Sequence, residues 1–268
     1  MLPNNINQVG NDYFKFKEFT VYQKHSVMRV NTDGVILGAW MQILSTDKNL
    51  LDVGTGTGII ALMAAQRLEK ACVGAEDKSG IAVCGIDSDA ASCSEAKTNF
   101  AESKWTKNLF AENAEFQTFA AIHKNQFDLV FSNPPYFTDS LKSSNKKKSS
   151  ARHNDILSQA DLIKGVTFCL KEGGRFALIL PTDEAENFLK KVQFLQAHFS
   201  QETCSPFLQL SRKCSVFYKR QEQIKRVMME FLYTRVPADY RDENLTIQNE
   251  TGYTPEYKNL TKDFYLTF

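Results

Sequence analysis

The sequence predicts an α/β fold: a doubly wound, mostly parallel β-sheet with an antiparallel edge at its C-terminal end. Two patterns predict it. Short apolar runs alternate with segments of helical periodicity from residue 49 to residue 199, as in successive β-α-β units. After residue 199 the apolar runs follow one another without helical segments between them, as antiparallel strands do.

The first β-α unit is the most sharply defined. An apolar run over 49–53 leads into three closely spaced glycines, and residues 59–67 then have helical spacing. The next apolar run covers 81–86. Either Ser88 or Asp89 is a suitable N-cap for the alanine-rich helix that follows it.

The remaining elements follow from the same two patterns. Strands are expected at the apolar runs 109–111, 127–131, 175–180, 207–210, 215–218 and 227–233. Helices are expected over 156–171 and 183–199. The strand over 127–131 ends before Pro134, because proline cannot continue a central strand.

Composition and charge narrow the class of protein. Of the 268 residues, 43% are hydrophobic and 24% are charged, as in an average globular chain, and the net charge is only +1. No apolar stretch approaches the roughly 20 residues that a membrane span needs. Residues 1–12 have neither the basic start nor the apolar run of a secretory signal, so we expect a cytoplasmic protein. The four histidines show no HxxxH spacing, so we expect no metal site.

A glycine-rich turn follows the first strand, at the edge where doubly wound sheets bind their ligands. Its sequence is Asp52-Val53-Gly54-Thr55-Gly56-Thr57-Gly58. The glycines allow positive φ and close approach of the backbone to a ligand, and the following helix directs free N–H groups at it. The spacing is neither that of a dinucleotide fold nor that of a P-loop. Asp52 repels a pyrophosphate but can pair with the ammonium of an aminoacyl group, so we expect S-adenosylmethionine rather than NAD.

A second carboxylate, Asp87, ends the strand predicted over 81–86. An acidic residue at this position accepts hydrogen bonds from ribose hydroxyls in nucleotide-binding folds. We therefore expect Asp87 to bind the ribose of the cofactor. The alternative is purely structural: the glycines form a tight turn and Asp87 caps the next helix.

The strand over 127–131 leads into Asn133-Pro134-Pro135-Tyr136, which should face the glycine turn across the switch point of the sheet. Pro134 and Pro135 have no N–H group, so the carbonyls of Asn133 and Pro134 lack nearby donors. The Asn133 side-chain oxygen and the Pro134 carbonyl can accept the two hydrogens of an exocyclic amine or of a primary amide.

Accepting both hydrogens frees the nitrogen lone pair for attack on an electrophilic methyl group, without a strongly basic side chain. Tyr136 offers an aromatic face on which a planar substrate can stack. Asn133-Pro134-Pro135-Tyr136 therefore predicts methyl transfer to an amine or amide nitrogen. The alternative is a rigid loop with a core tyrosine.

These two motifs resemble those of class I S-adenosylmethionine-dependent methyltransferases that modify amino groups. Three further segments resemble the bacterial tRNA(Val) adenine-N6 methyltransferase family: FKFKEFTV at 14–21, MRVNTDGVILGAW at 28–40 and YTPEYKNLTKDFY at 253–265. The resemblance implies a Rossmann-like sheet of seven strands and N6-methylation of adenosine 37, beside the anticodon of a valine-accepting tRNA. We expect a single methyltransferase domain over 1–268, in which 1–40 covers the cofactor and substrate and 41–268 forms the catalytic core.

The resemblance also assigns roles to individual residues. The cofactor-binding residues that it implies are Thr32, Asp33, Gly34, Asp52, Gly54, Thr55, Gly56, Gly58, Asp87, Glu115 and Asn133. The catalytic residues that it implies are Asn133, Pro134, Pro135 and Tyr136. Glu112 competes with Glu115 for the place beside the cofactor adenine. Residues 32–34 are expected either to close over the methionine end of the cofactor or to cap a helix.

An RNA substrate requires contacts to phosphates, and three basic segments are candidates. The first follows Tyr136, and we expect its residues Lys142, Lys146, Lys147, Lys148 and Arg152 to bind RNA. The second lies within 212–226 and contains Arg212, Lys213, Lys219, Arg220, Lys225 and Arg226. The third lies within 15–29 and contains Lys15, Lys17, Lys24 and Arg29. Each of them can equally be a solvated face.

Two other functions remain open. A methyltransferase acting on glutamine N5 of release factors shares both motifs, because a primary amide carries the same two hydrogens. Such enzymes usually carry a separate N-terminal helical domain, whereas the glycine turn begins here at residue 54 after an extended leader. A non-catalytic RNA-binding module explains the basic segments but not the two motifs. The sequence carries no indication of the oligomeric state.

Overall fold

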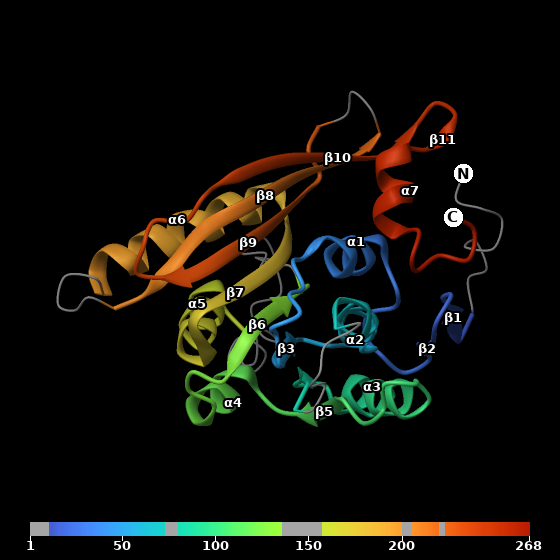
Figure 1. Ribbon diagram of the computed structural model, residues 1–268, viewed down its shortest axis with the longest axis horizontal. Coiled ribbons are helices and arrows are strands. Elements are labelled where there is room, and N and C mark those ends of the chain that lie inside the picture. The colour runs from blue at the N-terminus through green and yellow to red at the C-terminus, as the bar shows by residue number, and fades with distance from the viewer. Residues whose placement is uncertain (1–10, 73–79, 136–156, 200–204, 220–222) are drawn as a thin grey trace, which may run out of the picture.

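The centre of the protein is a nine-stranded sheet with the strand order β11-β10-β8-β9-β7-β6-β3-β4-β5 (Figure 1). The structure is a computed structural model that describes residues 11–72, 80–135, 157–199, 205–219 and 223–268. The strands of this sheet are β3 (Asn49–Val53), β4 (Ala82–Asp87), β5 (Leu109–Asn113), β6 (Phe127–Ser132), β7 (Leu170–Pro181), β8 (Phe207–Lys219), β9 (Arg226–Thr234), β10 (Arg241–Asn249) and β11 (Gly252–Tyr253). The helices are α1 (Thr32–Trp40), α2 (Ile59–Ala71), α3 (Ala90–Ala101), α4 (Phe116–Ile122), α5 (Gln159–Cys169), α6 (Thr182–Phe199) and α7 (Pro255–Thr261).

The sheet is doubly wound and mostly parallel, as predicted. Strands β5, β4, β3, β6 and β7 are parallel neighbours, and β9 runs antiparallel between β7 and β8. From β3 the chain adds β4 and β5 on one side of the sheet and then crosses back, so that β6 pairs with the other side of β3. This switch point is where such sheets bind ligands.

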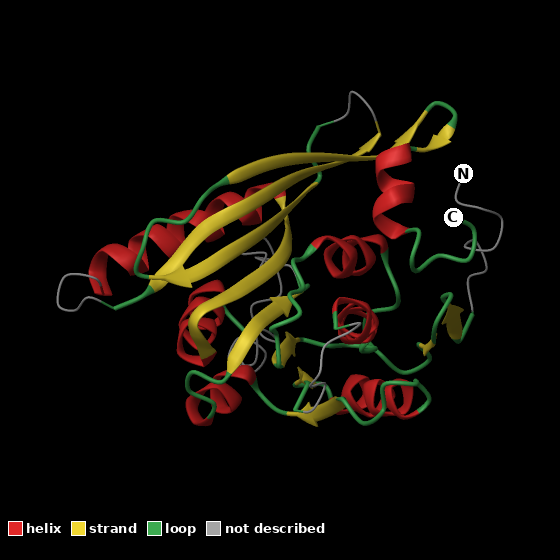
Figure 2. Ribbon diagram, in the orientation of Figure 1, coloured by secondary structure: helices red, strands yellow, loops and turns green. Residues whose placement is uncertain are grey.

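Two apolar cores lie on opposite faces of the sheet, because successive side chains of a strand point to opposite sides. In β3, for example, Leu50 packs with α1, α2 and α3, whereas Leu51 packs with α4, α5 and α6. Figure 2 shows the strands passing between these two groups of helices. Both faces are covered, which explains why the central strands are almost continuously apolar.

The helices begin where short polar side chains cap them. Asp89, one of the two candidates, is the N-cap of α3, and its carboxylate accepts a hydrogen bond of 2.7 Å from the Ser92 N–H. Asn31 caps α1 in the same way through the Gly34 N–H, and Ser158 caps α5. The helix α2 begins at Gly58, which has no side chain to cap it. None of the described helices is long and apolar enough to cross a membrane.

The C-terminal edge differs from the prediction in two ways. The runs 207–210 and 215–218 belong to one strand, β8, because the polar residues between them also pair with β9, with a register shift between Leu210 and Arg212. In addition, β10 pairs in parallel with β8, and β11 pairs antiparallel with β10, so the sheet has two strands beyond the seven implied by the resemblance.

Strand β7 also begins earlier than predicted. The preceding helix ends at Cys169, since Leu170 is already extended and pairs with Phe127 of β6. Gly173, with a φ of 82°, lies inside the strand and accompanies a shift in its register with β6.

A separate two-stranded antiparallel sheet, β1 (Tyr13–Lys15) and β2 (Thr20–Tyr22), lies near the C-terminal residues (Figure 1). The Lys17 N–H donates to the Phe264 carbonyl at 2.8 Å, and its ammonium group donates to the Lys262 carbonyl. The rings of Phe16 and Tyr265 stack with their centroids 5.9 Å apart. The two ends of the described chain therefore support each other.

Candidate active site

The glycine turn between β3 and α2 is held against the neighbouring strand. The N–H groups of Gly54 and Thr55 both donate to the Ile86 carbonyl at 2.9 Å, and the Gly56 N–H donates to the Asp87 carboxylate at 2.8 Å. Gly54 and Gly56 have φ values of 72° and 55°, in the left-handed region that favours glycine. A Cβ atom on either residue would meet nothing within 4 Å, so the turn borders open space.

Asp52 lies beneath this turn and is completely buried. Its Oδ2 atom accepts a hydrogen bond of 2.8 Å from the Thr55 hydroxyl, whereas Oδ1 has no hydrogen-bond partner among the described residues. Burial is the main cause that raises the pKa of Asp52 to about 7; the nearby Asp87 carboxylate acts in the same direction, and the hydrogen bond from Thr55 opposes both. A buried carboxylate of this kind is suited to a cationic ligand group.

Asp87 lies at the end of β4, and its carboxylate bonds both to the glycine turn and to the start of the next helix. One accepts from the Gly56 N–H and the other from the Asp89 N–H at 2.9 Å. Burial raises the pKa of Asp87, and these two hydrogen bonds oppose that effect. The Asn113 amide donates to the Asp87 carbonyl at 2.8 Å and thereby joins β5 to the same edge.

Glu112 and Glu115 both lie beyond this edge with exposed side chains. Glu112 is the β5 residue in register with Ile86, and Glu115 is the N-cap of α4, although its side chain makes no capping hydrogen bond. The geometry leaves both open as the carboxylate beside a cofactor adenine.

Asn133 follows β6 directly beside the glycine turn. Val53 and Ser132 are partners in the parallel register of β3 and β6, and the Ser132 hydroxyl donates to the Val53 carbonyl at 2.7 Å. Asn133 and Gly54 are therefore the next residues along two adjacent strands. Asn133 is half-buried, Pro134 is buried and Pro135 is exposed. Tyr136 lies outside the described residues.

A cavity of about 300 Å³ opens beside Asn133. Its other walls come from the loop before α1, from α1 and from the antiparallel strands: Met28, Asn31, Thr32, Asp33, Tyr218 and Arg226. The Asn133 amide nitrogen is 4.0 Å from the Met28 sulfur. The sequence offered no signal for Met28, Asn31 or Tyr218 as site residues, because they contribute to this wall only once the sheet has folded.

Residues 32–34 form the first turn of α1, directly after the Asn31 cap, and Thr32 and Asp33 also line the cavity. The Asp33 carboxylate accepts hydrogen bonds from the Tyr218 hydroxyl at 2.9 Å and from the Arg226 guanidinium at 2.7 Å. Gly34 donates to the Asn31 cap. The first turn of α1 is thus fixed to β8 and β9.

The basic segments differ in their surroundings. Lys142, Lys146, Lys147, Lys148 and Arg152 lie outside the described residues. In the second segment, Arg212 is within ion-pair distance of Glu230 and Glu243, and it stacks on Trp40 with its guanidinium carbon 4.2 Å from the ring centroid. Much of the positive charge of this second segment therefore serves internal contacts.

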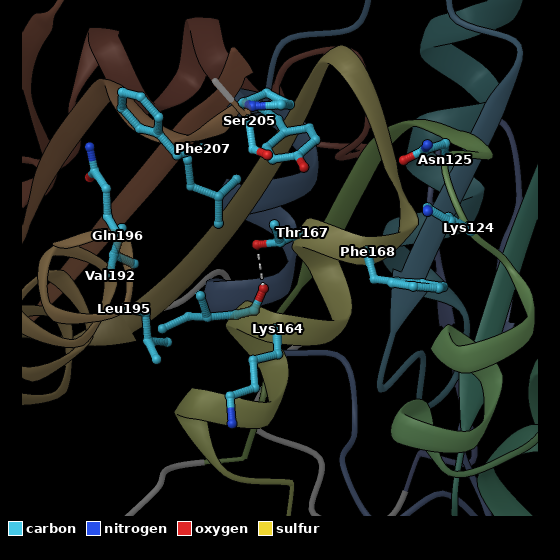
Figure 3. A pocket seen from close by; sticks show the side chains of 14 residues that line it. Lys124, Asn125, Lys164, Thr167, Phe168, Val192, Leu195, Gln196, Ser205 and Phe207 are labelled. Carbon is cyan, nitrogen blue, oxygen red and sulfur yellow. Dashed lines mark hydrogen bonds between the residues drawn. The ribbon is translucent and has the colours of Figure 1, made fainter. Parts of the chain in front are cut away.

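A second cavity, of about 310 Å³, lies between α5, α6 and the start of β8 (Figure 3). Its walls include Lys164 and Phe168 of α5 and Phe207 of β8, and Figure 3 also shows the Thr167 hydroxyl bonded to the Ile163 carbonyl. Asn125, which lines it, precedes β6, whereas Asn133 follows β6. This cavity is therefore at the opposite edge of the sheet, and none of the predicted site residues lines it. No three metal-ligating side chains converge within the described part of the chain.

Comparisons with known proteins agree with the fold. A family model described as a methyltransferase domain matches residues 44–231. The chain is 35% identical to the tRNA1(Val) (adenine(37)-N6)-methyltransferase of Trichodesmium erythraeum, with 97% of this chain and 100% of that protein covered. It is 36% identical to the protein of the same name from Bacteroides thetaiotaomicron, with 96% and 99% covered.

The fold is similar to that of solved methyltransferase structures. A structure described as a predicted O-methyltransferase from Agrobacterium tumefaciens superposes with a TM-score of 0.60 at 14% identity, covering 87% of this chain and 96% of that one. This likeness extends to the fold alone. At 35% and 36% sequence identity to the two named relatives over nearly its whole length, however, the chain belongs to the tRNA1(Val) (adenine(37)-N6)-methyltransferase family, a family of S-adenosylmethionine-dependent methyltransferases.

Proposed function

We propose that the protein transfers a methyl group from S-adenosylmethionine to N6 of adenosine 37 in tRNA(Val), within the anticodon region. The observation that carries the proposal is the register of β3 and β6, which brings Asn133 beside the glycine turn. The substrate is the one for which the two relatives, matched over nearly their whole length, are named. Because tRNA is modified in the cytoplasm, we propose this location for the protein.

The glycine turn is the proposed site for the aminoacyl part of the cofactor. The open space over Gly54 and Gly56 can receive a ligand that a Cβ atom would obstruct. The unpartnered Oδ1 of Asp52 supports pairing with the ligand's ammonium group. Thr55 positions Asp52, and Gly58 begins the helix whose N–H groups face the turn.

The remaining cofactor contacts are proposed from position along the same edge. Asp87 is assigned to the ribose, since its carboxylate has acceptor capacity beyond its two backbone bonds. Glu115 is assigned to the adenine, with Glu112 as the alternative. Residues 32–34 are assigned to the methionine end, because Thr32 and Asp33 share a cavity with Asn133 and Gly34 follows them in the same turn of α1. When bound, S-adenosylmethionine supplies an electrophilic methyl group.

Asn133 and Pro134 are the proposed catalytic acceptors. The Asn133 side-chain oxygen and the Pro134 carbonyl would each hold one hydrogen of the adenine amino group, which favours the pyramidal nitrogen needed for attack. Pro135 stiffens the turn, and Tyr136 would stack on the base. The same acceptors suit a glutamine amide, so release-factor methylation is the alternative that an experiment must separate.

The test is methyl transfer from labelled S-adenosylmethionine to a panel of unmodified tRNAs, duplex DNA and release factor, followed by nucleoside analysis. N6-methyladenosine confined to position 37 of tRNA(Val) is the expected product. Label in a glutamine side chain would keep the fold and the chemistry but replace the substrate. An absence of label in every acceptor would favour a non-catalytic RNA-binding module.

A further inference from the structure

Residues 13–29, here called the N-terminal segment, present two tyrosine rings side by side on the protein surface. Tyr13 and Tyr22 are directly opposite each other in the register of β1 and β2, with exposed fractions of 51% and 42%. Residues that face each other across an antiparallel pair project from the same side of the sheet. The inward side is apolar, because Phe16 and Val21 are buried.

This segment is fixed to one face of α3 by side chains spaced as successive turns of a helix. Asn99 exchanges hydrogen bonds with the backbone of Tyr22, at 2.8 Å from its N–H and 2.9 Å to its carbonyl. One turn nearer the N-terminus of α3, the Glu95 carboxylate accepts from three consecutive N–H groups, those of Lys24, His25 and Ser26, at 2.6, 2.9 and 2.8 Å.

Ser92, in the first turn of α3, then accepts from the Val27 N–H at 3.3 Å. The segment therefore runs along α3 from Asn99 to Ser92, and Figure 1 shows it passing from β2 to the start of α1. It ends at the cavity, where the half-exposed Met28 lies beside Asn133. Partial burial alone would raise the pKa of Glu95, but the hydrogen bonds that its carboxylate accepts from residues 24–26 outweigh this effect and lower the pKa.

The charge of the N-terminal segment is available to a ligand. Lys15, Lys24, His25 and Arg29 are exposed, and no ion pair joins any of them to the residues that the structure describes. The contrast is with Arg212 and Lys213 on β8, which pair with Glu243 and Asp242. Between these two basic segments, the N-terminal one is the better match for a polyanion.

We propose that the N-terminal segment is the surface on which the anticodon loop of the tRNA docks. Tyr13 and Tyr22 would stack on unpaired bases, and Lys15, Lys24 and Arg29 would contact phosphates, while the cavity at Asn133 receives the target adenosine. Glu95 is the positioning residue that keeps the path from the tyrosines to the cavity in one conformation. This inference rests on the proposed function and adds the site of RNA contact to it.

The test compares steady-state methylation of tRNA(Val) by the full chain and by two double variants, Tyr13→Ala with Tyr22→Ala and Lys15→Ala with Lys24→Ala. We expect the KM for tRNA to rise at least about tenfold in each, with kcat changed less than threefold and cofactor affinity unchanged. Removing the two lysines should also lower the slope of log affinity against log salt by about 1.4.

Matched controls remove the same side chains elsewhere. Tyr240→Ala deletes a tyrosine that is 50% exposed just before β10, and Lys164→Ala deletes an exposed lysine of α5. Both should keep the KM of the wild type. For the positioning role, Glu95→Gln should raise the KM for tRNA without changing cofactor affinity.

Asp128→Asn is the control for Glu95, since Asp128 also accepts from two consecutive backbone N–H groups, those of Lys48 and Asn49, but at the other end of β3. Unchanged KM in both double variants, in an enzyme that methylates tRNA, would overturn the docking inference and leave the proposed function intact. A wild-type chain that neither methylates nor binds tRNA would overturn both.

Discussion

Asp33 and Arg226 form an ion pair of 2.7 Å that ties the first turn of α1 to β9 along one wall of the cavity at Asn133. The two side chains are only 10% and 20% exposed. The Tyr218 hydroxyl donates to the same carboxylate, so α1 meets two strands that lie far from it in the sequence at one group. Loss of the cation removes a charged partner from a largely buried carboxylate.

Arg226→Ala is therefore expected to destabilise the protein by roughly 3 kcal/mol, the low end of the range for breaking one side of a buried pair, because the guanidinium is 20% exposed. Urea unfolding measures the change. Asp33→Asn in the same chain should recover part of it, because the uncompensated charge is then gone. An unfolding midpoint equal to that of the wild type would show that the ion pair contributes nothing to stability.

Asn133→Ala is expected to lower kcat for methyl transfer by at least about a hundredfold, since one acceptor of the amino hydrogens is lost. RNA affinity should change little, because the residue contributes no charge. Single-turnover rates and a filter-binding assay on the same preparation separate the two effects. Undiminished transfer would exclude the proposed role of Asn133.

Asp52→Asn is expected to change stability and cofactor affinity in opposite directions. The pKa of Asp52 is raised to about 7 in the fold, so between pH 4 and 7 the folded state holds a proton that the unfolded state has released. Stability of the wild type must then fall as the pH rises through this window. The neutral variant avoids this loss and should be more stable at pH 8, by up to about 4 kcal/mol, with the difference vanishing below pH 4.

The same substitution should weaken binding of S-adenosylmethionine at every pH above 7. In the wild type, affinity should rise between pH 6 and 8 as Asp52 ionises. Calorimetric titration and thermal melting at several pH values check both parts. A variant that is less stable than the wild type at pH 8 would contradict the conclusion that burial of the ionised Asp52 destabilises the fold.

Gly58→Ala is expected to lose stability, whereas Gly54→Ala is expected to lose cofactor affinity. A Cβ atom at Gly58 would lie 2.4 Å from the Phe100 ring, in addition to the strain of a φ of 80°, so this variant should lose several kcal/mol of stability. At Gly54 the same atom meets nothing, and only the backbone strain of about 1 kcal/mol remains. Gly54→Ala should therefore stay folded but bind the cofactor at least tenfold more weakly, as melting curves with and without ligand would show.

Local secondary structure could be predicted from the sequence wherever a single residue type decides it. The strand at Asn49–Val53, a helix cap at Ser88 or Asp89 and the end of β6 before Pro134 all follow from apolar runs, capping preference and the missing proline N–H, and the structure places the cap at Asp89. Their placement at one edge then follows from the parallel strands of β-α-β units, whose carboxyl ends lie at the same edge of the sheet. The geometry of Asp52, Asp87 and Asn133 was predictable for this reason, although their roles stay predictions.

The antiparallel edge was less predictable, because its polar residues are paired with one another. Arg212 interrupts the apolar pattern of β8, yet it lies inside the protein between Trp40, Glu230 and Glu243. Strand β10 has only Leu245 and Ile247 buried, too few for a recognisable apolar run. No local sequence pattern predicts that Tyr218 and Arg226 bind Asp33 in the first turn of α1.

The hydrogen bonds from Lys17 to Phe264 and Lys262 have a consequence for the order of folding. The ammonium contact joins residues separated by 245 positions, so the hairpin of β1 and β2, although synthesised first, gains these partners only when nearly the whole chain is available. Contacts of such long range form late, after the loop between them has been closed by the core. A nascent chain would thus complete its sheet before this hairpin settles, and truncation or tagging near the last residues should loosen the segment at the other end of the chain.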